Sequence, residues 1–148
     1  MAATIMQVAR TLGQISGWSL SNLELQKIAY IAEMIHLGRT GAPLVDENWQ
    51  AWNYGPVQPA LYHKAKVFGT SPVKDIFNAS TLDEGSQFKA INDAYQIMKK
   101  MNPGQMVAVT HRPNGAWSKH FNTARRGVVI PKRDIAEEYN VLIDDDDA

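Results

Sequence analysis

Residues 21–37 read SNLELQKIAYIAEMIHL, a run with the apolar spacing of a buried α-helix. Ser21 can cap the start of this helix, and Glu24 stands three residues later, which is the spacing of a capping box. The main apolar stripe consists of Leu25, Ile28, Ala32 and Ile35. Because further apolar residues widen this stripe, we expect the helix to lie at the centre of the domain and to end at Gly38 and Gly41.

Two further amphipathic runs, one before and one after the central helix in the sequence, also predict helices. The first run ends near Gly17 and the second ends near Pro103. Their stripes are Ile5, Val8, Leu12 and Ile15 in the first, and Phe88, Ile91, Tyr95 and Met98 in the second. Bulky residues predict a short β-hairpin near 44–52, and a β-branched run predicts a strand near 128–130. We therefore expect a mainly α fold, a compact single helical domain with a small antiparallel β element.

Composition excludes several classes of protein. A length of 148 residues suits one domain, and 45% hydrophobic with 20% charged residues is ordinary for a folded chain. The formal net charge of zero argues against a strongly basic nucleic-acid binder, and the absence of cysteine excludes disulfides and thiol nucleophiles. Because the chain has neither a long apolar run nor the features of a signal peptide, we expect a cytoplasmic protein without membrane association.

The zero net charge conceals a strong asymmetry along the chain. Residues 60–133 carry a net charge of +8, whereas residues 134–148 carry −7. The second segment contains the adjacent carboxylates Asp144–Asp147, which repel one another and cannot be buried together. We therefore divide the chain into a folded domain at 1–140 and an acidic flexible C-terminal tail at 141–148. The tail is either a solubilising terminus or an arm that binds the basic middle of the chain or a basic partner.

The sequence offers no pattern for catalysis or metal binding. No two of the four histidines have the i, i+4 spacing of a helical zinc site. The chain also lacks a Gly-x-Ser-x-Gly elbow, a P-loop and a Gly-x-Gly-x-x-Gly loop. We therefore predict a protein that is not an enzyme and has no catalytic residue, no metal site and no cofactor.

Basic pairs raise the question of anionic ligands. Arg125-Arg126 and Lys132-Arg133 flank the strand predicted near 128–130, and Lys99-Lys100 ends a predicted helix. A solvated surface, or the favourable position of cations at a helix C-terminus, accounts for such pairs. The alternative is the binding of an acidic protein surface or a phosphate backbone.

The most distinctive segment lies between residues 49 and 62. It contains Trp49, Trp52, Tyr54, Pro56, Pro59 and Tyr62. One interpretation is that the aromatic residues fill the core of a small domain. The other is a preorganised aromatic surface, because Tyr and Trp dominate interface hot spots and a proline-stiffened loop loses little freedom on binding.

These segments resemble the Panacea domain family. NLELQKIAY at residues 22–30 resembles the N-L-x-L-Q-K-L-x-Y helix of that family, and AWNYGPV at residues 51–57 resembles its most recognisable block. The later matches are Pro59, Tyr62, Thr110-His111 and Trp117. The resemblance runs over roughly residues 5–139, and it implies that the Panacea-type domain is the segment 1–140.

The resemblance to these antitoxins and phage-associated proteins implies a protein-binding role without enzymatic activity. It implies an antitoxin of a bacterial toxin–antitoxin system, which neutralises a cognate protein toxin by direct binding. The alternative is a proteolytic adaptor that delivers its toxin to an AAA+ protease such as ClpXP, with a ClpX-type unfoldase as a second partner.

We expect the distinctive block and its neighbours to form the partner surface. The predicted partner-binding residues are Trp52, Tyr54, Gly55, Pro56, Val57, Tyr62, His111 and Trp117. The predicted structural support consists of Gln26, Lys27 and Tyr30 on the central helix. Because Gln26 and Tyr30 stand one helical turn apart, we expect both to hydrogen-bond the Trp52–Val57 loop and hold its shape.

Overall fold

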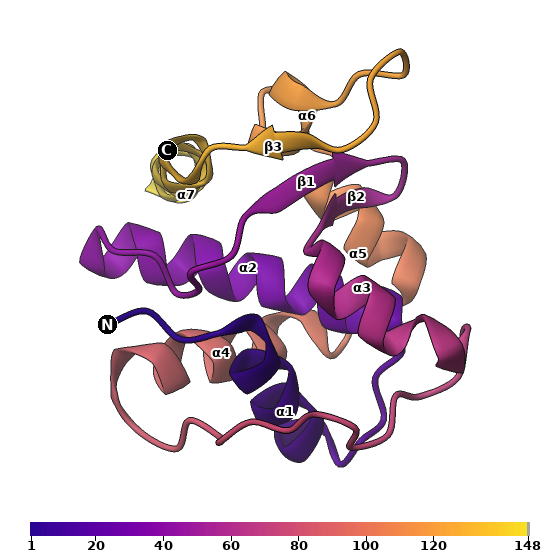
Figure 1. Cartoon of the computed structure of the whole chain (residues 1–148). Coiled ribbons are helices and arrows are strands. Elements are labelled where there is room, and N and C mark those ends of the chain that lie inside the picture. The colour runs from indigo at the N-terminus through magenta and orange to yellow at the C-terminus, as the bar shows by residue number, and fades with distance from the viewer. Residues whose placement is uncertain (148) are drawn as a thin grey trace.

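The computed structural model describes the backbone of residues 1–147 and the side chains of residues 1–141. Within that part the chain is mainly helical with a small antiparallel sheet, which confirms the predicted fold class (Figure 1). The helices are α1 (Ile5–Ser16), α2 (Asn22–Thr40), α3 (Pro59–Ala65), α4 (Gly85–Met98), α5 (Pro103–Thr110), α6 (Ala116–His120) and α7 (Lys132–Asp147), with a 3₁₀ turn η1 (Lys66–Phe68). The strands are β1 (Trp49–Trp52), β2 (Gly55–Val57) and β3 (Val128–Ile130).

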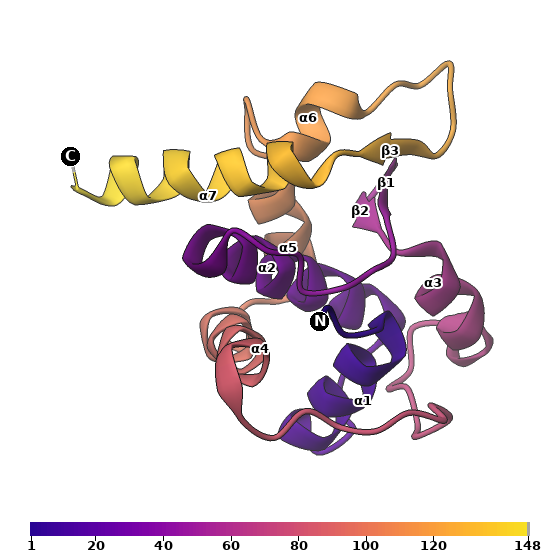
Figure 2. The same cartoon turned by 60° about the vertical axis from the view of Figure 1, so that its left-hand side comes forward.

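Helix α2 lies at the centre of the molecule, as its sequence predicts. The side chain of Ser21 accepts the amide of Glu24, and the side chain of Glu24 accepts the amide of Ser21, so the predicted capping box is present. Every residue from Leu25 to Leu37 is buried. Figure 2 shows the reason: α7 and α4 lie on opposite sides of α2, and the sheet and α3 cover another side.

The predicted end of α2 is partly wrong. The helix ends at Gly41, whose φ of 76° is the left-handed conformation of a helix C-cap, but Gly38 is an interior helical residue. Its missing side chain instead makes room for α7. A Cβ at Gly38 would lie 2.0 Å from Cδ2 of Tyr139. A glycine that permits tertiary packing therefore has the appearance, in sequence, of a helix terminator.

The hairpin predicted near 44–52 is displaced along the chain. Its strands are β1 and β2, with Trp52 opposite Gly55 and the turn at residues 53–54. Two features explain how residues 55–57 form a strand. Gly55 accepts a φ of 111°, and β2 is an edge strand in the order β2-β1-β3, where Pro56 deprives no neighbouring strand of a hydrogen bond. The predicted strand near 128–130 is confirmed as β3, which pairs antiparallel with β1.

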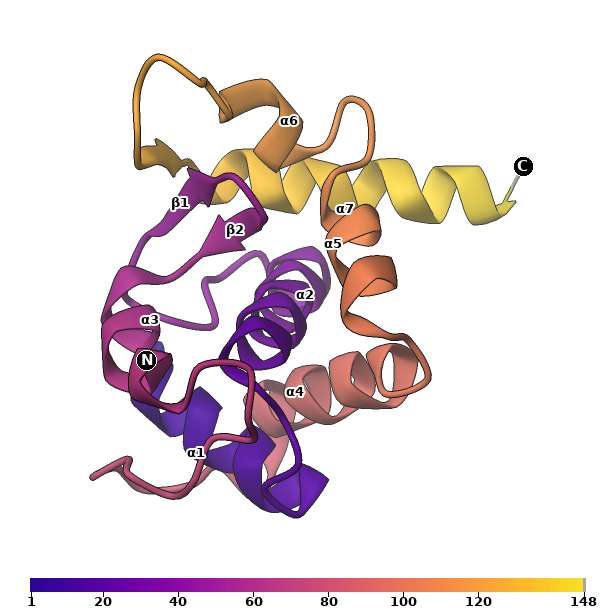
Figure 3. The same cartoon turned by 90° about the vertical axis from the view of Figure 1, so that its right-hand side faces the viewer.

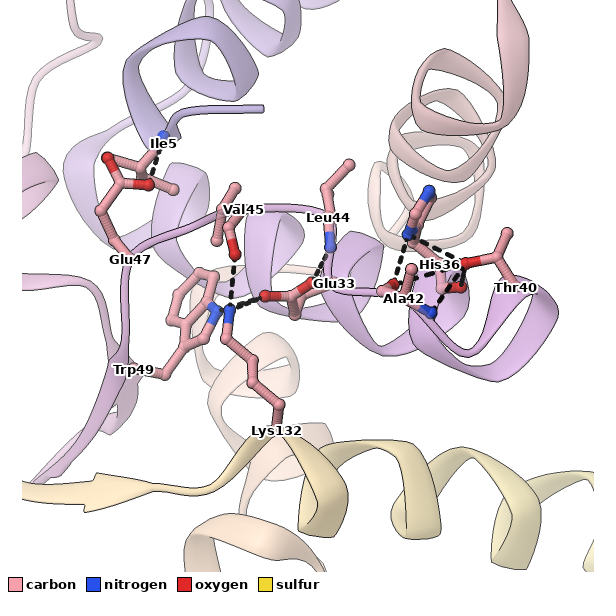
Figure 4. Close-up of polar contacts among 10 residues, drawn as sticks. All are labelled: Ile5, Glu33, His36, Thr40, Ala42, Leu44, Val45, Glu47, Trp49 and Lys132. Atoms are coloured by element: carbon pink, nitrogen blue, oxygen red, sulfur yellow. Dashed lines mark hydrogen bonds and ion pairs between the residues drawn. The ribbon is translucent and has the colours of Figure 1, made fainter. Parts of the chain in front are cut away.

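Residues 41–48 form a connecting strap between α2 and the sheet. Its polar groups are bound by side chains of α2 and α7 (Figure 4) and by the backbone of Ala3, which forms a parallel bridge with Val45. The buried carboxylate of Glu33 accepts the amide of Leu44, the ammonium of Lys132 and, at 3.4 Å, the indole N–H of Trp49. Lys132 also donates to the carbonyl oxygen of Val45 at 3.0 Å. This cluster ties the strap, α2 and α7 together.

Two further sequence predictions concern the C-terminal tail and membrane association. In the predicted acidic tail at 141–148, only the first side chain belongs to those that the structure describes. The flexibility and the role of this tail therefore stay predictions. Among the described residues, none of the helices combines the length and the apolar character needed to cross a membrane.

Candidate functional site

Two side chains of α2 bind the outer edge of strand β2 and its continuation. The carboxamide of Gln26 pairs with the backbone of Gln58, accepting its amide at 2.8 Å and donating to its carbonyl at 3.2 Å. The next residue, Lys27, donates from Nζ to the carbonyl oxygen of Pro56 at 2.9 Å. Both side chains are buried. They therefore do for this edge what a neighbouring strand would do, and they hold the hairpin in place.

The ammonium of Lys27 lies in an unusual environment. Lys27 is only 1% exposed, and its ammonium contacts a neutral carbonyl rather than a carboxylate. Burial accordingly lowers the pKa of Lys27 from 10.5 to about 7. Close to neutral pH the amine is therefore divided between its charged and neutral forms, and either form can donate to Pro56.

Gly55 is required where the hairpin meets α2 and α5. Its φ of 111° disfavours any side chain. A Cβ at this position would lie 2.6 Å from Oγ1 of Thr110 and 3.3 Å from Nζ of Lys27. The backbone of the hairpin can thus approach both helices only because residue 55 is glycine.

An aromatic stack supports the hairpin from α6. The ring of His111 lies 3.7 Å from that of Trp117, and the ring of Trp117 lies 4.6 Å from that of Phe121. The indole N–H of Trp117 donates to the carbonyl oxygen of Trp52 at 2.7 Å, which joins the stack to β1. Burial, and then the charge of Lys27, lower the pKa of His111, against a raising contribution from a hydrogen bond with the backbone of Tyr54. The imidazole is therefore neutral at pH 7.

A groove of about 1010 Å³ lies in front of the hairpin. Its walls come from α2, the hairpin, the α3–η1 segment and residues 121–127, and Figure 1 shows the last three together on the right-hand side. Aromatic groups line it, and Trp52 and Tyr62 meet edge to face with ring centres 4.8 Å apart. Tyr54, at the hairpin turn, is 69% exposed. Cationic side chains complete the lining, namely Lys66, Arg125 and Arg126 beside the buried Lys27.

The structure brings part of the predicted partner surface together in this groove. Trp52, Tyr54, Val57 and Tyr62 line it. The other four residues lie behind this surface. Gly55 and Pro56 are buried within β2, and His111 and Trp117 belong to the supporting stack. The role of all eight in binding a partner stays a prediction.

Two of the three predicted support residues, Gln26 and Lys27, bind the hairpin or the residue directly after it, and Tyr30 does not. Lys27 does hydrogen-bond the hairpin, at the carbonyl of Pro56 in β2, whereas Gln26 reaches Gln58, just after the Trp52–Val57 loop. The expectation for Tyr30 is wrong. Its hydroxyl donates to Oε1 of Glu138 on α7 at 2.8 Å, because the tyrosine ring faces the Trp49 side of the helix.

Sequence reasoning missed the groove wall formed by residues 121–127. Phe121, Arg125 and Arg126 reach the hairpin because β3 pairs with β1, with Val129 opposite Gln50. The Arg125-Arg126 pair is visible in the sequence as a possible anion-binding element, but its proximity to Trp52 is not. Among the described residues, no group of three or more His, Cys, Asp or Glu side chains is placed to hold a metal ion.

Comparison with known proteins gives two matches and one negative result. A family model described as "Antitoxin SocA-like, Panacea domain" matches residues 25–118. Antitoxin SocA of Caulobacter vibrioides (strain NA1000 / CB15N) is 32% identical over 109 residues, which are 66% of this chain and 58% of that relative. The chain thus spans less than two thirds of the length of this curated relative. No solved structure gives a significant match.

Proposed function

Because the chain belongs to the family of SocA-like antitoxins with a Panacea domain, we propose that it is the antitoxin of a bacterial toxin–antitoxin system. It neutralises a cognate protein toxin by binding it directly, and it does so without catalysis. This role belongs in the cytoplasm, the location that the sequence predicts. The observation that carries the proposal is the family match over residues 25–118, which include the hairpin and the α2 side chains that hold it.

We propose the exposed front of the hairpin as the centre of the toxin interface. Tyr54 protrudes from the turn, and Trp52 and Tyr62 lie beside it in the groove. Large aromatic side chains on a rigid support lose little conformational entropy on binding, and such residues dominate interface hot spots. The reciprocal Gln26–Gln58 pair and the Lys27 contact supply that rigidity.

The proposal is tested by expressing the chain together with the product of the adjacent gene. The expected result is a complex that co-purifies and restores growth of cells that produce the toxin. If the two proteins form no complex and growth is not restored, the antitoxin assignment is wrong.

The interface is tested with Tyr54→Ala in the same complex. We expect the affinity for the toxin to fall about tenfold or more, the usual effect of truncating an interface hot spot. The matched control is Ile97→Ala, which truncates an apolar side chain that is 55% exposed on α4, outside the groove. Equal affinities for the two variants would remove Tyr54 from the interface.

The adaptor alternative requires a further strain. If the chain delivers its toxin to a protease, toxin levels should fall when the chain is produced, and deletion of the ClpX-type unfoldase should abolish growth rescue. Rescue that persists in the deletion strain identifies direct neutralisation.

A further inference from the structure

We propose that the groove binds an acidic segment of the protein partner, anchored by an apolar or aromatic side chain of that segment. This inference rests on the proposed function for the existence of a protein partner. It deepens that function by specifying the chemistry of the segment that the partner presents.

The first argument is uncompensated positive charge. Lys66, Arg125 and Arg126 line the groove, and no Asp or Glu does so among the described residues. The segments that carry these three cations are also free of carboxylates, because residues 48–74 and 94–133 contain neither Asp nor Glu. On the α2 wall, Glu24 is engaged in the capping box with Ser21.

The groove cations are among the basic residues that have no carboxylate partner in the part of the chain whose side chains are described. The basic residues with a carboxylate partner include Arg10, Arg39, Arg112, Lys119 and Lys132. Within the part of the chain whose side chains are described, Lys66, Arg125 and Arg126 take part in no ion pair or side-chain hydrogen bond. Three cations around one groove therefore lack counter-charges, and an acidic ligand would supply them.

The second argument is that the arginines stand on an ordered turn. The side chain of Asn122 accepts the amide of Ala124 at 2.8 Å, and its carbonyl oxygen accepts the amide of Arg125 at 3.2 Å. Gly127 then lies directly against β1, since a Cβ there would be 2.7 Å from Oε1 of Gln50. The backbone that carries the cations is thus fixed before a ligand binds, which lowers the entropic cost of binding.

The third argument is the aromatic surface that lines the same groove. Trp52 is held by a hydrogen bond from its indole N–H to Oε1 of Gln50 at 3.0 Å, and it packs edge to face with Tyr62. Phe121 and the exposed Tyr54 add two further rings to the groove lining. Carboxylates alone would leave these rings uncovered, so the fitting segment combines acidic residues with an apolar anchor.

Aromatic and basic groups together also suit single-stranded nucleic acid, which therefore has to be distinguished by experiment. Two observations favour a peptide. The net charge of the whole chain is zero, and the partner of the proposed function is a protein. The family match ends at residue 118, so the groove wall that carries Arg125 and Arg126 lies outside the matched region. This placement suits a contact that selects one particular partner.

The test measures fluorescence anisotropy of the full chain with three labelled probes. The first is a peptide in which Asp and Glu alternate with Phe and Leu, the second is the same peptide with Asn and Gln in place of the acids, and the third is oligo-dT. Each probe is titrated with the wild type, with Arg125→Glu/Arg126→Glu, and with Lys99→Glu/Lys100→Glu. The last variant applies the same charge change at the end of α4, outside the groove.

We expect the acidic peptide to bind about tenfold tighter than its amide counterpart, with a loss of about tenfold or more in the groove variant alone. The proposal is overturned if the wild type binds both peptides equally or neither, if both variants lose affinity equally, or if oligo-dT is the preferred probe. Growth rescue by the wild type is scored separately. A failed peptide experiment with rescue intact rejects this inference but not the antitoxin function, and the reverse result rejects the antitoxin function alone.

Discussion

Helix α2 holds two regions of the molecule by different chemistry. Toward the strap, the buried carboxylate of Glu33 pairs with Lys132 and binds two N–H groups. Toward the hairpin, Lys27 and Gln26 bind backbone carbonyls and an amide without a charged partner. The ion pair joins segments that form the scaffold, whereas the neutral contacts support the hairpin that lines the groove. The scaffold is thus held by a charge pair, whereas the hairpin is held by hydrogen bonds to the backbone, one of them from an amine that has no counter-charge in contact with it among the described side chains.

The largest effect is expected from breaking the ion pair. Glu33→Ala leaves the ammonium of Lys132 without its carboxylate and the amide of Leu44 without its acceptor. Loss of one partner from a buried pair typically lowers the free energy of unfolding by about 3–5 kcal/mol. Urea denaturation at pH 7 measures this change.

The double variant Glu33→Leu/Lys132→Met provides the control. It removes both charges, so we expect it to be more stable than Glu33→Ala. If Glu33→Ala lowers the free energy of unfolding by less than about 1 kcal/mol, the usual effect of an average substitution, the cluster does not have the proposed scaffold role.

A smaller and pH-dependent effect is expected at Lys27. Its pKa in the folded state is about 7, below the 10.5 of an unperturbed lysine, so the unfolded chain binds more protons between these values. The free energy of unfolding therefore rises with pH above 7, by at most about 1.4 kcal/mol per pH unit. Below pH 7 both states bind the proton and this contribution is constant.

The measurement is urea denaturation from pH 7 to 9.5 for the wild type and Lys27→Met. This range lies above the pKa of His111, which is lowered from 6.5, so that residue does not titrate within it. It also lies below the pKa of 10.0 at which tyrosine ionises in the unfolded chain, so the raised pKa of Tyr30 has little effect on stability here. Lys27→Met should abolish most of the rise. A wild-type protein whose stability is flat over this range, or a variant that retains the slope, would show that burial of Lys27 does not produce it.

The contribution of the neutral contacts themselves is expected to be smaller again. Gln26→Ala removes both hydrogen bonds to the backbone of Gln58 and leaves its buried amide unsatisfied, which costs about 1–3 kcal/mol. Gln14→Ala, at an exposed position of α1, is the matched control and should change stability by less than about 0.5 kcal/mol. Equal stability of the two variants would contradict the view that Gln26 covers the edge of β2.

These two regions also show what a sequence can predict. The capping box at Ser21 and Glu24 is a local pattern, and it locates the start of α2 correctly. Gly38 and Pro56 mislead because their meaning depends on distant partners. Tyr139 packs against Gly38, and an edge position permits Pro56 in a strand. Trp52, Tyr54 and Tyr62 come from one contiguous segment, whereas Arg125 and Arg126 reach the groove only through the pairing of β3 with β1.

The smallest change in stability is expected for the groove cations. Arg125→Gln/Arg126→Gln removes charges that lack an ion-pair partner among the described residues and lie on an exposed turn. Because exposed substitutions of this kind usually change stability by less than about 0.5 kcal/mol, the melting temperature should shift by no more than about 2 °C. A larger fall would mean that the arginines belong to the scaffold, as Lys132 does. An unchanged melting temperature together with weaker binding of the acidic peptide would assign them to recognition, the role that a groove lining without Asp or Glu among the described residues predicts.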